Sequence, residues 1–303
     1  MQCNLYQNNL TMLVLLLLST VVNGETWPEE EHPKSLAYQS VSMEQFSELE
    51  AGFDHVFASN DFSGLLTFYH MDPLPNAKAS DLETTQHHPR ITLLKSKRVY
   101  GWGVMEYAPK GKNNWFLQVS HRYHDKWTAD IAADWWQSAQ FKAVMLNSVH
   151  RYAGRDKGLG VNTDFSSAAN NPMLAASRAF VSHFDHALVF QLHGFSKAKR
   201  KNLPAQQADV ILSYGVNLPT MYLAKLHRAK NCIASVAKVE VLVFPAQINE
   251  LGGTTNVIGQ GLRQLGFFEQ FIHIELSREI RKAMNQDPRL SAQVLNCIVD
   301  GVK

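Results

Sequence analysis

The sequence has few cysteines, little net charge and no long apolar segment after its first residues. Its 303 residues include three cysteines, and the formal net charge is +2. Lysine and arginine are dispersed except in the short run at 197–201, which we interpret as a solvated loop in preference to an anion site. Without a basic stripe, nucleic acid is not an expected partner. No later apolar run reaches the roughly 20 residues that span a bilayer, so we expect no transmembrane domain in the mature chain.

The composition also excludes disorder as the main state. Hydrophobic residues make up 45% of the chain and charged residues 18%, and a chain of this length can bury a full core. We therefore predict a single domain at 42–303. It would consist of a strand-rich N-terminal portion at 42–113 and the main core at 114–303.

The first 24 residues differ from everything that follows. They contain no Asp, Glu, Lys or Arg, and residues 12–22 form an almost unbroken apolar run. This run has the length of the apolar part of a signal peptide, about 7–15 residues, and small residues precede Glu25. We predict a signal peptide at 1–24, a polar linker at 25–41 and an exported protein, periplasmic or secreted. Because no Lys or Arg precedes the run, a retained N-terminal anchor is the alternative.

Removal of this leader would leave Cys232 and Cys297 as the only cysteines. An oxidising compartment would permit them to form a disulfide. Spacing alone does not show whether their Cα atoms lie within bridging distance. A disulfide and two buried free thiols therefore both stay open.

From residue 114 onward, short apolar runs alternate with amphipathic stretches. This rhythm is typical of a sheet with substantial parallel character and helices on both faces. We therefore predict an α/β fold, a three-layer α/β/α sandwich with a mostly parallel mixed sheet. The predicted strands are 115–119, 143–146, 187–192, 209–212, 239–244 and 271–276, preceded by short strands at 65–69, 91–95 and 99–105. The predicted helices are 128–140, 172–183, 220–230, 256–265 and 277–284.

Polar side chains gather at the ends of four predicted strands. In open α/β sheets, ligands bind beyond the carboxyl ends of the strands, so we expect these side chains to meet at one rim. They are imidazole, carboxylate and guanidinium groups: His121, His124, Asp125, His150, Arg151, His193, His273 and Glu275.

Three of these residues, His121, Asp125 and His193, form the donor set of a catalytic zinc site. Catalytic zinc usually takes three imidazole or carboxylate ligands from the protein. One short loop would supply His121 with Asp125, or with His124 in its place. Glu275 lies in an apolar run, where a carboxylate is costly to bury without a function or a partner. It is the candidate general base that takes a proton from an attacking water.

Further residues are open to two interpretations. Arg151 and Arg278 could bind a substrate carboxylate as bidentate donors, although Arg278 could equally be a surface ion-pair residue. The glycine-rich stretch 251–256 could hold an anion, but capping of the following helix is favoured. Structural or solvated roles are favoured for other histidines and aromatic residues: His87, His88, His183, His186, His227, and Trp135, Trp136, Phe267 and Phe268 in the core.

Several fragments between residues 114 and 284 together carry a family resemblance. They are Ser120-His121 with Asp125 and Thr128, Val149-His150-Arg151, Gln191-Leu192-His193-Gly194-Phe195, Gly253-Thr254-Thr255-Asn256-Val257 and His273-Ile274-Glu275-Leu276. This set resembles the zinc-dependent amidohydrolases and peptidases related to N-formylglutamate amidohydrolase and the zinc carboxypeptidases.

The resemblance implies a zinc-exopeptidase-like α/β/α fold and one zinc ion held by His121, Asp125 and His193, with Glu275 as general base. The carboxypeptidases place the acidic ligand three residues after the histidine, which in this chain is His124. His150 and Arg151 stand where those enzymes have an asparagine-arginine pair that binds the substrate carboxylate. We therefore expect an exported zinc-dependent hydrolase that cleaves an amide bond in a peptide or N-acyl amino acid, with its catalytic core at 114–303.

The alternative is a non-catalytic exported ligand-binding protein on the same fold. It would use the polar rim to hold a ligand without turning it over. A serine esterase is poorly supported, because the chain contains no Gly-x-Ser-x-Gly elbow.

Overall fold

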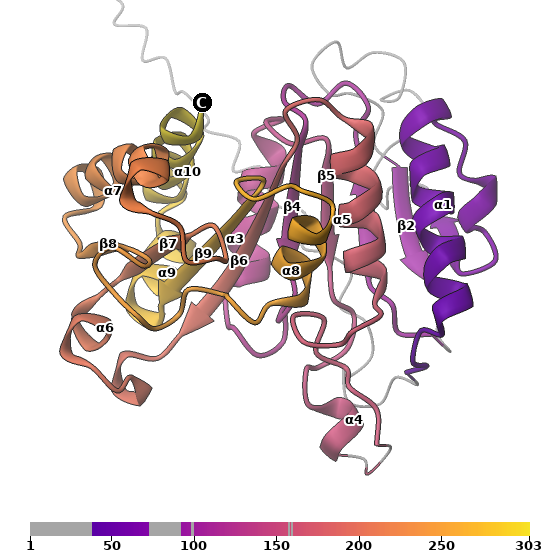
Figure 1. Cartoon of the computed structure of the whole chain (residues 1–303), viewed down its shortest axis with the longest axis horizontal. Coiled ribbons are helices and arrows are strands. Elements are labelled where there is room, and N and C mark those ends of the chain that lie inside the picture. Colours follow the sequence, from indigo (N-terminus) through magenta and orange to yellow (C-terminus); the bar gives the residue numbers. More distant parts are fainter. Residues whose placement is uncertain (1–37, 73–91, 98–99, 157, 159) are drawn as a thin grey trace, which may run out of the picture.

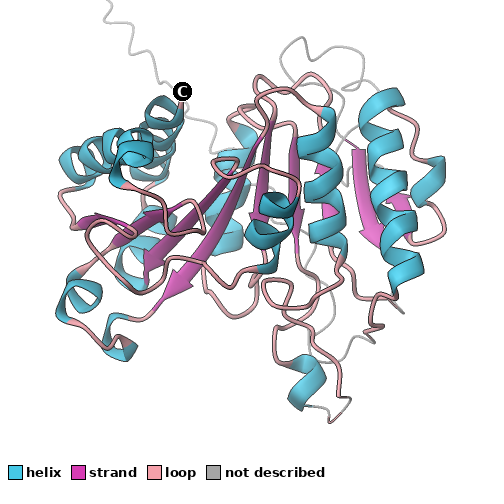
Figure 2. Ribbon diagram, viewed as in Figure 1, coloured by secondary structure: helices cyan, strands magenta, loops and turns pink. Residues whose placement is uncertain are grey.

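A computed structural model describes residues 38–72, 92–97, 100–156, 158 and 160–303. The predicted signal peptide and most of the predicted linker lie outside the described residues. Within them, the chain forms a nine-stranded mixed sheet with helices on both faces (Figures 1 and 2). The predicted α/β class and its three layers are therefore confirmed.

The centre of the sheet is parallel and its flanks are antiparallel. The strand order is β1-β2-β3-β5-β4-β6-β9-β7-β8. Strands β5, β4, β6 and β9 run parallel to one another, β1, β2 and β3 add antiparallel strands at one side, and β7 turns antiparallel to β9 before pairing in parallel with β8. The strands are β1 (Tyr69–Asp72), β2 (Thr92–Ser96), β3 (Val104–Tyr107), β4 (Trp115–Val119), β5 (Ala143–Leu146), β6 (Leu188–Phe195), β7 (Val210–Ser213), β8 (Val241–Val243) and β9 (Phe271–Ser277).

Strand β6 runs three residues further than the predicted 187–192. Its last residues stay in the sheet because His193 and Gly194 pair with Glu275 and Leu276 of β9. A polar residue next to a glycine indicates a loop when the sequence is considered alone. The parallel neighbour supplies the hydrogen bonds that keep it extended.

One face of the sheet is covered by four helices: α3 (Thr128–Gln137), α7 (Ala224–Ala237), α9 (Arg278–Gln286) and α10 (Pro288–Val302). Side chains such as Trp135 and Ile298 pack there against strand residues such as Leu117 and Ile274. Helix α10 was absent from the predicted elements. A disulfide between Cys232 and Cys297 joins α7 to α10, with their Cα atoms 5.3 Å apart, which decides between the two alternatives for these cysteines.

The opposite face, nearer the viewer in Figure 1, is covered by α1 (Met43–Ser59), α5 (Pro172–His183) and α8 (Val257–Gln264), with the short α6 (Leu203–Gln207) over β7 and β8. Helix α1 lies in the portion predicted as strand-rich, where no helix was predicted. Its signals are present in the sequence: a capping box between Ser42 and Gln45, and a buried stripe that includes Leu49, Phe53 and Val56. The other short helices are α4 (Ala153–Asp156) and the 3-10 turns η1 (Ser63–Leu65), η2 (Lys197–Lys199) and η3 (Thr220–Leu223).

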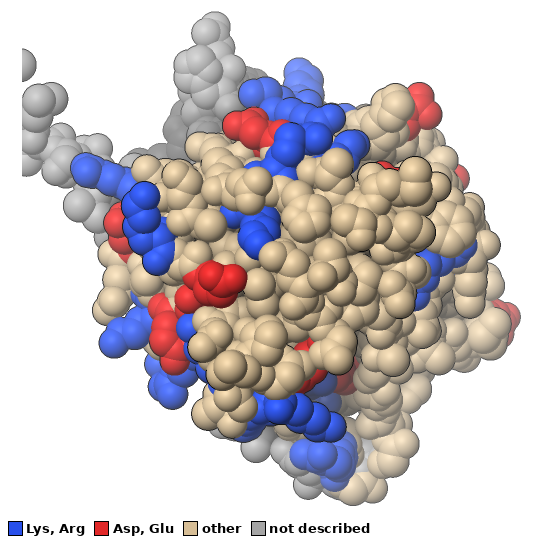
Figure 3. Space-filling model, turned by 60° about the vertical axis from the view of Figure 1, so that its left-hand side comes forward, with Lys and Arg blue, Asp and Glu red and all other residues tan. Residues whose placement is uncertain are grey.

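The aromatic prediction is partly wrong. Trp135 and Trp136 are buried, but Phe268 is 50% exposed because it lies in the loop between α8 and β9. On the face drawn in Figure 3, lysine and arginine side chains form separate groups among acidic and uncharged residues. Within the described ranges, no helix combines the length and the apolar character needed to cross a membrane.

Candidate metal centre

The candidate site lies at the carboxyl-terminal ends of β4, β6 and β9, on the face covered by α5 and α8. His121 and Asp125 belong to the loop between β4 and α3. The amide of Asp125 donates to the carbonyl of His121, and the Thr128 hydroxyl donates to the carbonyl of Asp125 at 2.6 Å. These turns bring the Asp125 carboxylate beside the His121 ring. His193 comes from the end of β6, which is paired with β4 through Gln118 and Gln191.

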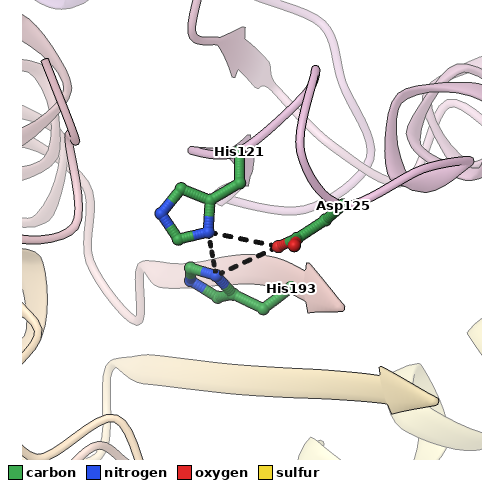
Figure 4. A group of neighbouring side chains, drawn as sticks. All are labelled: His121, Asp125 and His193. Carbon is green, nitrogen blue, oxygen red and sulfur yellow. Dashed lines mark hydrogen bonds and ion pairs between the residues drawn. The ribbon is translucent and has the colours of Figure 1, made fainter. Parts of the chain in front are cut away.

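The three predicted ligand residues converge on one point (Figure 4). His121 Nδ1 lies 3.1 Å from His193 Nδ1 and 3.1 Å from Asp125 Oδ2, and His193 Nδ1 lies 3.8 Å from the same oxygen. All three side chains are buried. A tetrahedral zinc ion with bonds of about 2.0–2.1 Å holds its ligand atoms about 3.3–3.4 Å apart. Two of the separations lie slightly below that spacing, and the third lies about 0.4 Å above it.

The outer nitrogens of both rings are already engaged. His121 Nε2 lies 2.8 Å from Asp164 Oδ1, and His193 Nε2 lies 2.7 Å from Gln191 Oε1. Carboxylate and amide oxygens only accept, so each Nε2 carries a proton, and in a neutral ring the lone pair is then on Nδ1. Arg151 Nη1, which can only donate, lies 3.1 Å from His121 Nδ1 and agrees with this tautomer.

When both rings are neutral, two lone pairs therefore face one another at 3.1 Å beside a carboxylate. Two acceptors cannot hydrogen-bond to each other, whereas a divalent cation can bind both. Histidine ligands of metals ordinarily donate their other N–H to a carboxylate or carbonyl oxygen. Both rings have that arrangement, so the residues present fit a zinc ion.

The pKa values of the three side chains shift in different directions. Burial alone raises the pKa of Asp125, but hydrogen bonds to His121 and His193 outweigh it, and the net pKa is lowered. Burial lowers the pKa of His193. Burial also lowers the pKa of His121. Hydrogen bonds to Asp125 and Asp164 and their negative charges outweigh burial, so the pKa of His121 is raised overall. The site thus combines an anionic ligand with a neutral His193.

A second group, His193, His273 and Glu275, has ligand atoms within 4.8 Å of one another. It shares His193 with the first group, so the two sets compete for one imidazole ring. His273 Nδ1 has no hydrogen-bond partner in the described part of the chain, so its ring lacks the outer partner that both rings of the first set have. The first set is therefore the better candidate for an ion, and Glu275 would then be an adjacent carboxylate outside the ligand set.

Glu275 lies opposite His193 in the register of β6 and β9. It is buried, and its Oε2 has no hydrogen-bond partner among the described residues. Burial, and to a smaller extent the charge of Asp125, raises the pKa of Glu275 to about 8. A cation bound nearby would lower that pKa, because an opposite charge stabilises the carboxylate.

The glycine-rich stretch 251–256 contributes to the site through packing. Gly253 has a φ of +64°, and a Cβ atom there would lie 2.8 Å from the His273 ring. The glycine therefore lets the loop lie against His273. Asn256 caps α8 by accepting from the amide of Ile258, which confirms the capping interpretation.

The structure places Arg151 beside the three candidate ligands, and His124 and Arg278 outside the group. His124 is exposed, and its ring lies against those of His150 and Tyr152. Of the two alternatives, Asp125 therefore belongs to the group. Arg151 binds Asp164 through Nη2 at 2.5 Å, so its guanidinium is held beside the site. Arg278 is exposed at the first residue of α9.

Sequence reasoning missed two residues of this region, Asp164 and Arg281. Asp164 lies in a loop whose pattern is irregular, and no signal indicated it. Arg281 is buried and donates to the carbonyls of Lys126, Phe195 and Ser277. It thereby ties together the chain segments that follow β4, β6 and β9. Its position between Ile280 and Met284 on the buried stripe of α9 was a usable signal.

A half-open hollow of about 490 Å³ lies at the other end of the sheet. It is lined by the first residues of β4 and β6, Trp115 and Leu188, together with Tyr214 and Lys225. None of the candidate metal ligands borders it. The hollow and the polar cluster are thus separate features.

No family model and no curated protein matches this sequence. Among solved structures, a zinc-free YNDL structure is similar at 13% identity and a TM-score of 0.39, over 62% of this chain and 83% of that one. A metallo-carboxypeptidase from Burkholderia cenocepacia has 10% identity and a TM-score of 0.41, over 88% of this chain and 70% of its own. One from Pseudomonas aeruginosa has 13% identity and a TM-score of 0.40, over 88% and 71%. Similarity at this level supports no conclusion about family or activity.

Proposed function

We propose that this protein is an exported hydrolase that uses one zinc ion to cleave an amide bond in a peptide or N-acyl amino acid. One observation is the main support for a metal ion at this site. The Nδ1 atoms of His121 and His193 lie 3.1 Å apart beside Asp125, while both Nε2 atoms are engaged elsewhere.

The donor set favours zinc among the common divalent ions. Two imidazoles and one carboxylate are the ligands of a familiar class of catalytic zinc site, whereas calcium and magnesium prefer oxygen donors alone. Three protein ligands leave one position open to a substrate. When bound, zinc supplies Lewis acidity that polarises a carbonyl group and acidifies water.

Glu275 provides the proton acceptor in this proposal. Its Oε2 would take a proton from the attacking water and later deliver it to the departing amine nitrogen. The carboxylate is buried beside His193, and no ligand of the proposed ion competes for it. Arg281 stabilises the ionised forms of Asp125 and Glu275 through its positive charge.

The substrate class rests on the resemblance to amidohydrolases and on cations at the rim. Arg151 lies beside His121, and Arg200 lies near enough to Glu275 for its charge to lower the pKa of that residue. Both arginines are partly exposed, with side-chain exposures of 24% and 22%. A free carboxylate on the substrate, as in an N-acyl amino acid or a peptide end, would be attracted by these charges. Arg151 has this effect while its Nη2 remains bound to Asp164.

Export is supported by two independent features. The leader-like residues 1–24 are the first. The second is the disulfide between Cys232 and Cys297, since structural disulfides persist mainly in oxidising compartments.

The proposal is tested by metal content and by the substitution Glu275→Gln. Wild-type protein should contain about one zinc per chain and hydrolyse members of a panel of N-acyl amino acids and short peptides, with products detected by mass spectrometry. Glu275→Gln keeps the shape of the side chain but removes the proton acceptor. It should retain zinc and lose about 10²–10⁴-fold in kcat.

Glu279→Gln is the matched control, because Glu279 is exposed on α9 four residues away. It should leave both zinc content and turnover unchanged. Zinc binding without turnover on any substrate would instead favour a ligand-binding protein. Protein that binds no zinc would contradict the proposed site.

A further inference from the structure

A chain of buried amide side chains lies behind His193, on the side away from the proposed ion. Gln191, two residues earlier on β6, accepts from His193 Nε2 at 2.7 Å. Gln118 on β4 is its partner in register, and Ser177 on α5 lies beyond Gln118. Gln118, Gln191 and Ser177 have no solvent exposure. Buried polar groups are costly unless paired, so an apolar core would be the simpler filling for this space.

The donor and acceptor of each hydrogen bond between Ser177 and Gln191 follow from the position of Ser177 on α5. The Ser177 hydroxyl donates its single proton to the carbonyl of Met173 at 2.6 Å, so its oxygen must accept from Gln118 Nε2, also at 2.6 Å. Gln118 Oε1 then faces Gln191 Nε2 at 3.1 Å. Gln191 Oε1 is therefore the atom turned toward His193.

The other side of Gln191 enforces the same orientation. Asn256 Oδ1 accepts from the amide of Ile258, which can only donate, so Asn256 Nδ2 points the other way. It donates to Gln191 Oε1 at 2.5 Å. Two backbone groups, the carbonyl of Met173 and the amide of Ile258, thus exclude a flipped Gln191 amide.

An oxygen in this position admits only one neutral tautomer of His193. Nε2 must carry the proton, which leaves the lone pair on Nδ1, 3.1 Å from His121 Nδ1. The opposite tautomer would place an N–H against His121 and leave Nε2 and Gln191 Oε1 as two facing acceptors.

We propose that Gln191 is a positioning residue for the metal centre, and that Gln118, Ser177 and Asn256 hold its amide so that His193 presents Nδ1 to the cation. The metal part of this inference rests on the proposed function, whereas the tautomer part does not. It also gives the loop that contains Asn256 a role at the site beyond capping α8.

The first measurement is the zinc dissociation constant, by competition with a chelator. Gln191→Met keeps the length of the side chain but neither accepts from His193 nor donates to Gln118. We expect its zinc affinity to fall by about 10–100-fold, the range for loss of an outer partner of a metal ligand. Gln191→Glu retains an acceptor for His193 Nε2 and should recover most of that affinity.

Ser177→Ala tests the far end of this row of side chains, because Ser177 lies three hydrogen bonds away from His193. It should weaken zinc binding by a smaller factor, several-fold. Ser291→Ala is the matched control, since Ser291 is also a fully buried serine of a helix but lies on α10, on the opposite face of the sheet. It should leave zinc affinity unchanged.

The second measurement is the tautomer of His193 in metal-free protein, from long-range ¹H–¹⁵N spectra of histidine-labelled chain. The His193 signals are assigned by their loss in His193→Ala. Wild type should show the Nε2–H form, and Gln191→Met a mixture of both forms. This result is expected even if the protein binds no zinc, so failure of the proposed function and failure of this inference are distinguishable.

The inference is overturned if folded Gln191→Met shows wild-type zinc affinity, or if wild-type His193 carries its proton on Nδ1. If Gln191→Met does not fold, Gln191→Glu and Ser177→Ala decide. Zinc affinity could then be equal in Ser177→Ala, Ser291→Ala and wild type, and the His193 tautomer unchanged in Ser177→Ala. Both results together would contradict the proposed role of these hydrogen-bonded side chains.

Discussion

Residues with a single hydrogen-bonding role decide the character of the candidate site. Asp164 can only accept from His121 Nε2, and Arg151 can only donate toward His121 Nδ1. Together they select one tautomer of His121, as Gln191 does for His193. A donor set identical in composition, but without these neighbours, would leave the lone pairs free to point elsewhere.

The choice between Asp125 and His124 gives a prediction at this scale. Asp125→Asn removes the anionic ligand and should weaken zinc binding by more than about 100-fold, since loss of an outer partner alone costs about 10–100-fold. His124→Asn should leave the affinity unchanged because His124 is exposed and lies outside the group. Both are measured by competition with a chelator. The reverse ranking would make His124 the second ligand.

Among the elements, helix α10 is a main part of one helical layer. Helix α10 packs against α7 and α3 and supplies Val294, Ile298 and Val302 to the core of that face. The disulfide joins it to α7 across a sequence separation of 65 residues. Closing a loop of that length restricts the unfolded chain, which stabilises the folded state.

Replacement of both cysteines by serine should therefore lower the free energy of unfolding by about 2–4 kcal/mol. Urea titrations of the Cys232→Ser, Cys297→Ser variant and of wild type would measure the difference. Wild type treated with a reductant should approach the variant, because Cys232 is exposed. Unchanged unfolding midpoints in both experiments would show that the bond contributes nothing to stability.

For the whole molecule, the arrangement of the sheet determines which residues become neighbours. The parallel strands β4, β6 and β9 end at the same edge, so residues 121, 193 and 275 meet although more than seventy positions separate each from the next. A parallel sheet does this in general, because each crossover returns the chain to the same end of the sheet.

Location is also a property of the whole chain. Expressed with residues 1–24 in a bacterial host, the protein should be recovered outside the cytoplasm with an intact mass that begins at Glu25. A variant that lacks residues 2–24 should stay in the cytoplasm. Membrane-bound protein of full-length mass would instead identify a retained anchor, and full-length protein in the cytoplasm would contradict export.

Predicted and observed element ends agree best where a short apolar run has polar residues on both sides. Strands β4 and β5 and helix α5 begin and end at the predicted residues, because buried parallel strands are continuous apolar runs and Asn171 caps the following helix. Helix α1 was missed although its capping box and apolar stripe are in the sequence. Polar residues interrupt its apolar stripe, so the stretch also fits an irregular pattern.

The sequence by itself determined the α/β class and the residue types that end the central strands, since both follow from local periodicity and composition. Only the tertiary structure decided that Asp125 rather than His124 faces the two histidines, that Asp164 and Gln191 lie behind them, and that the two cysteines are joined. Each of these depends on segments remote in the chain that become adjacent when the sheet forms. A one-dimensional pattern contains no distance between them.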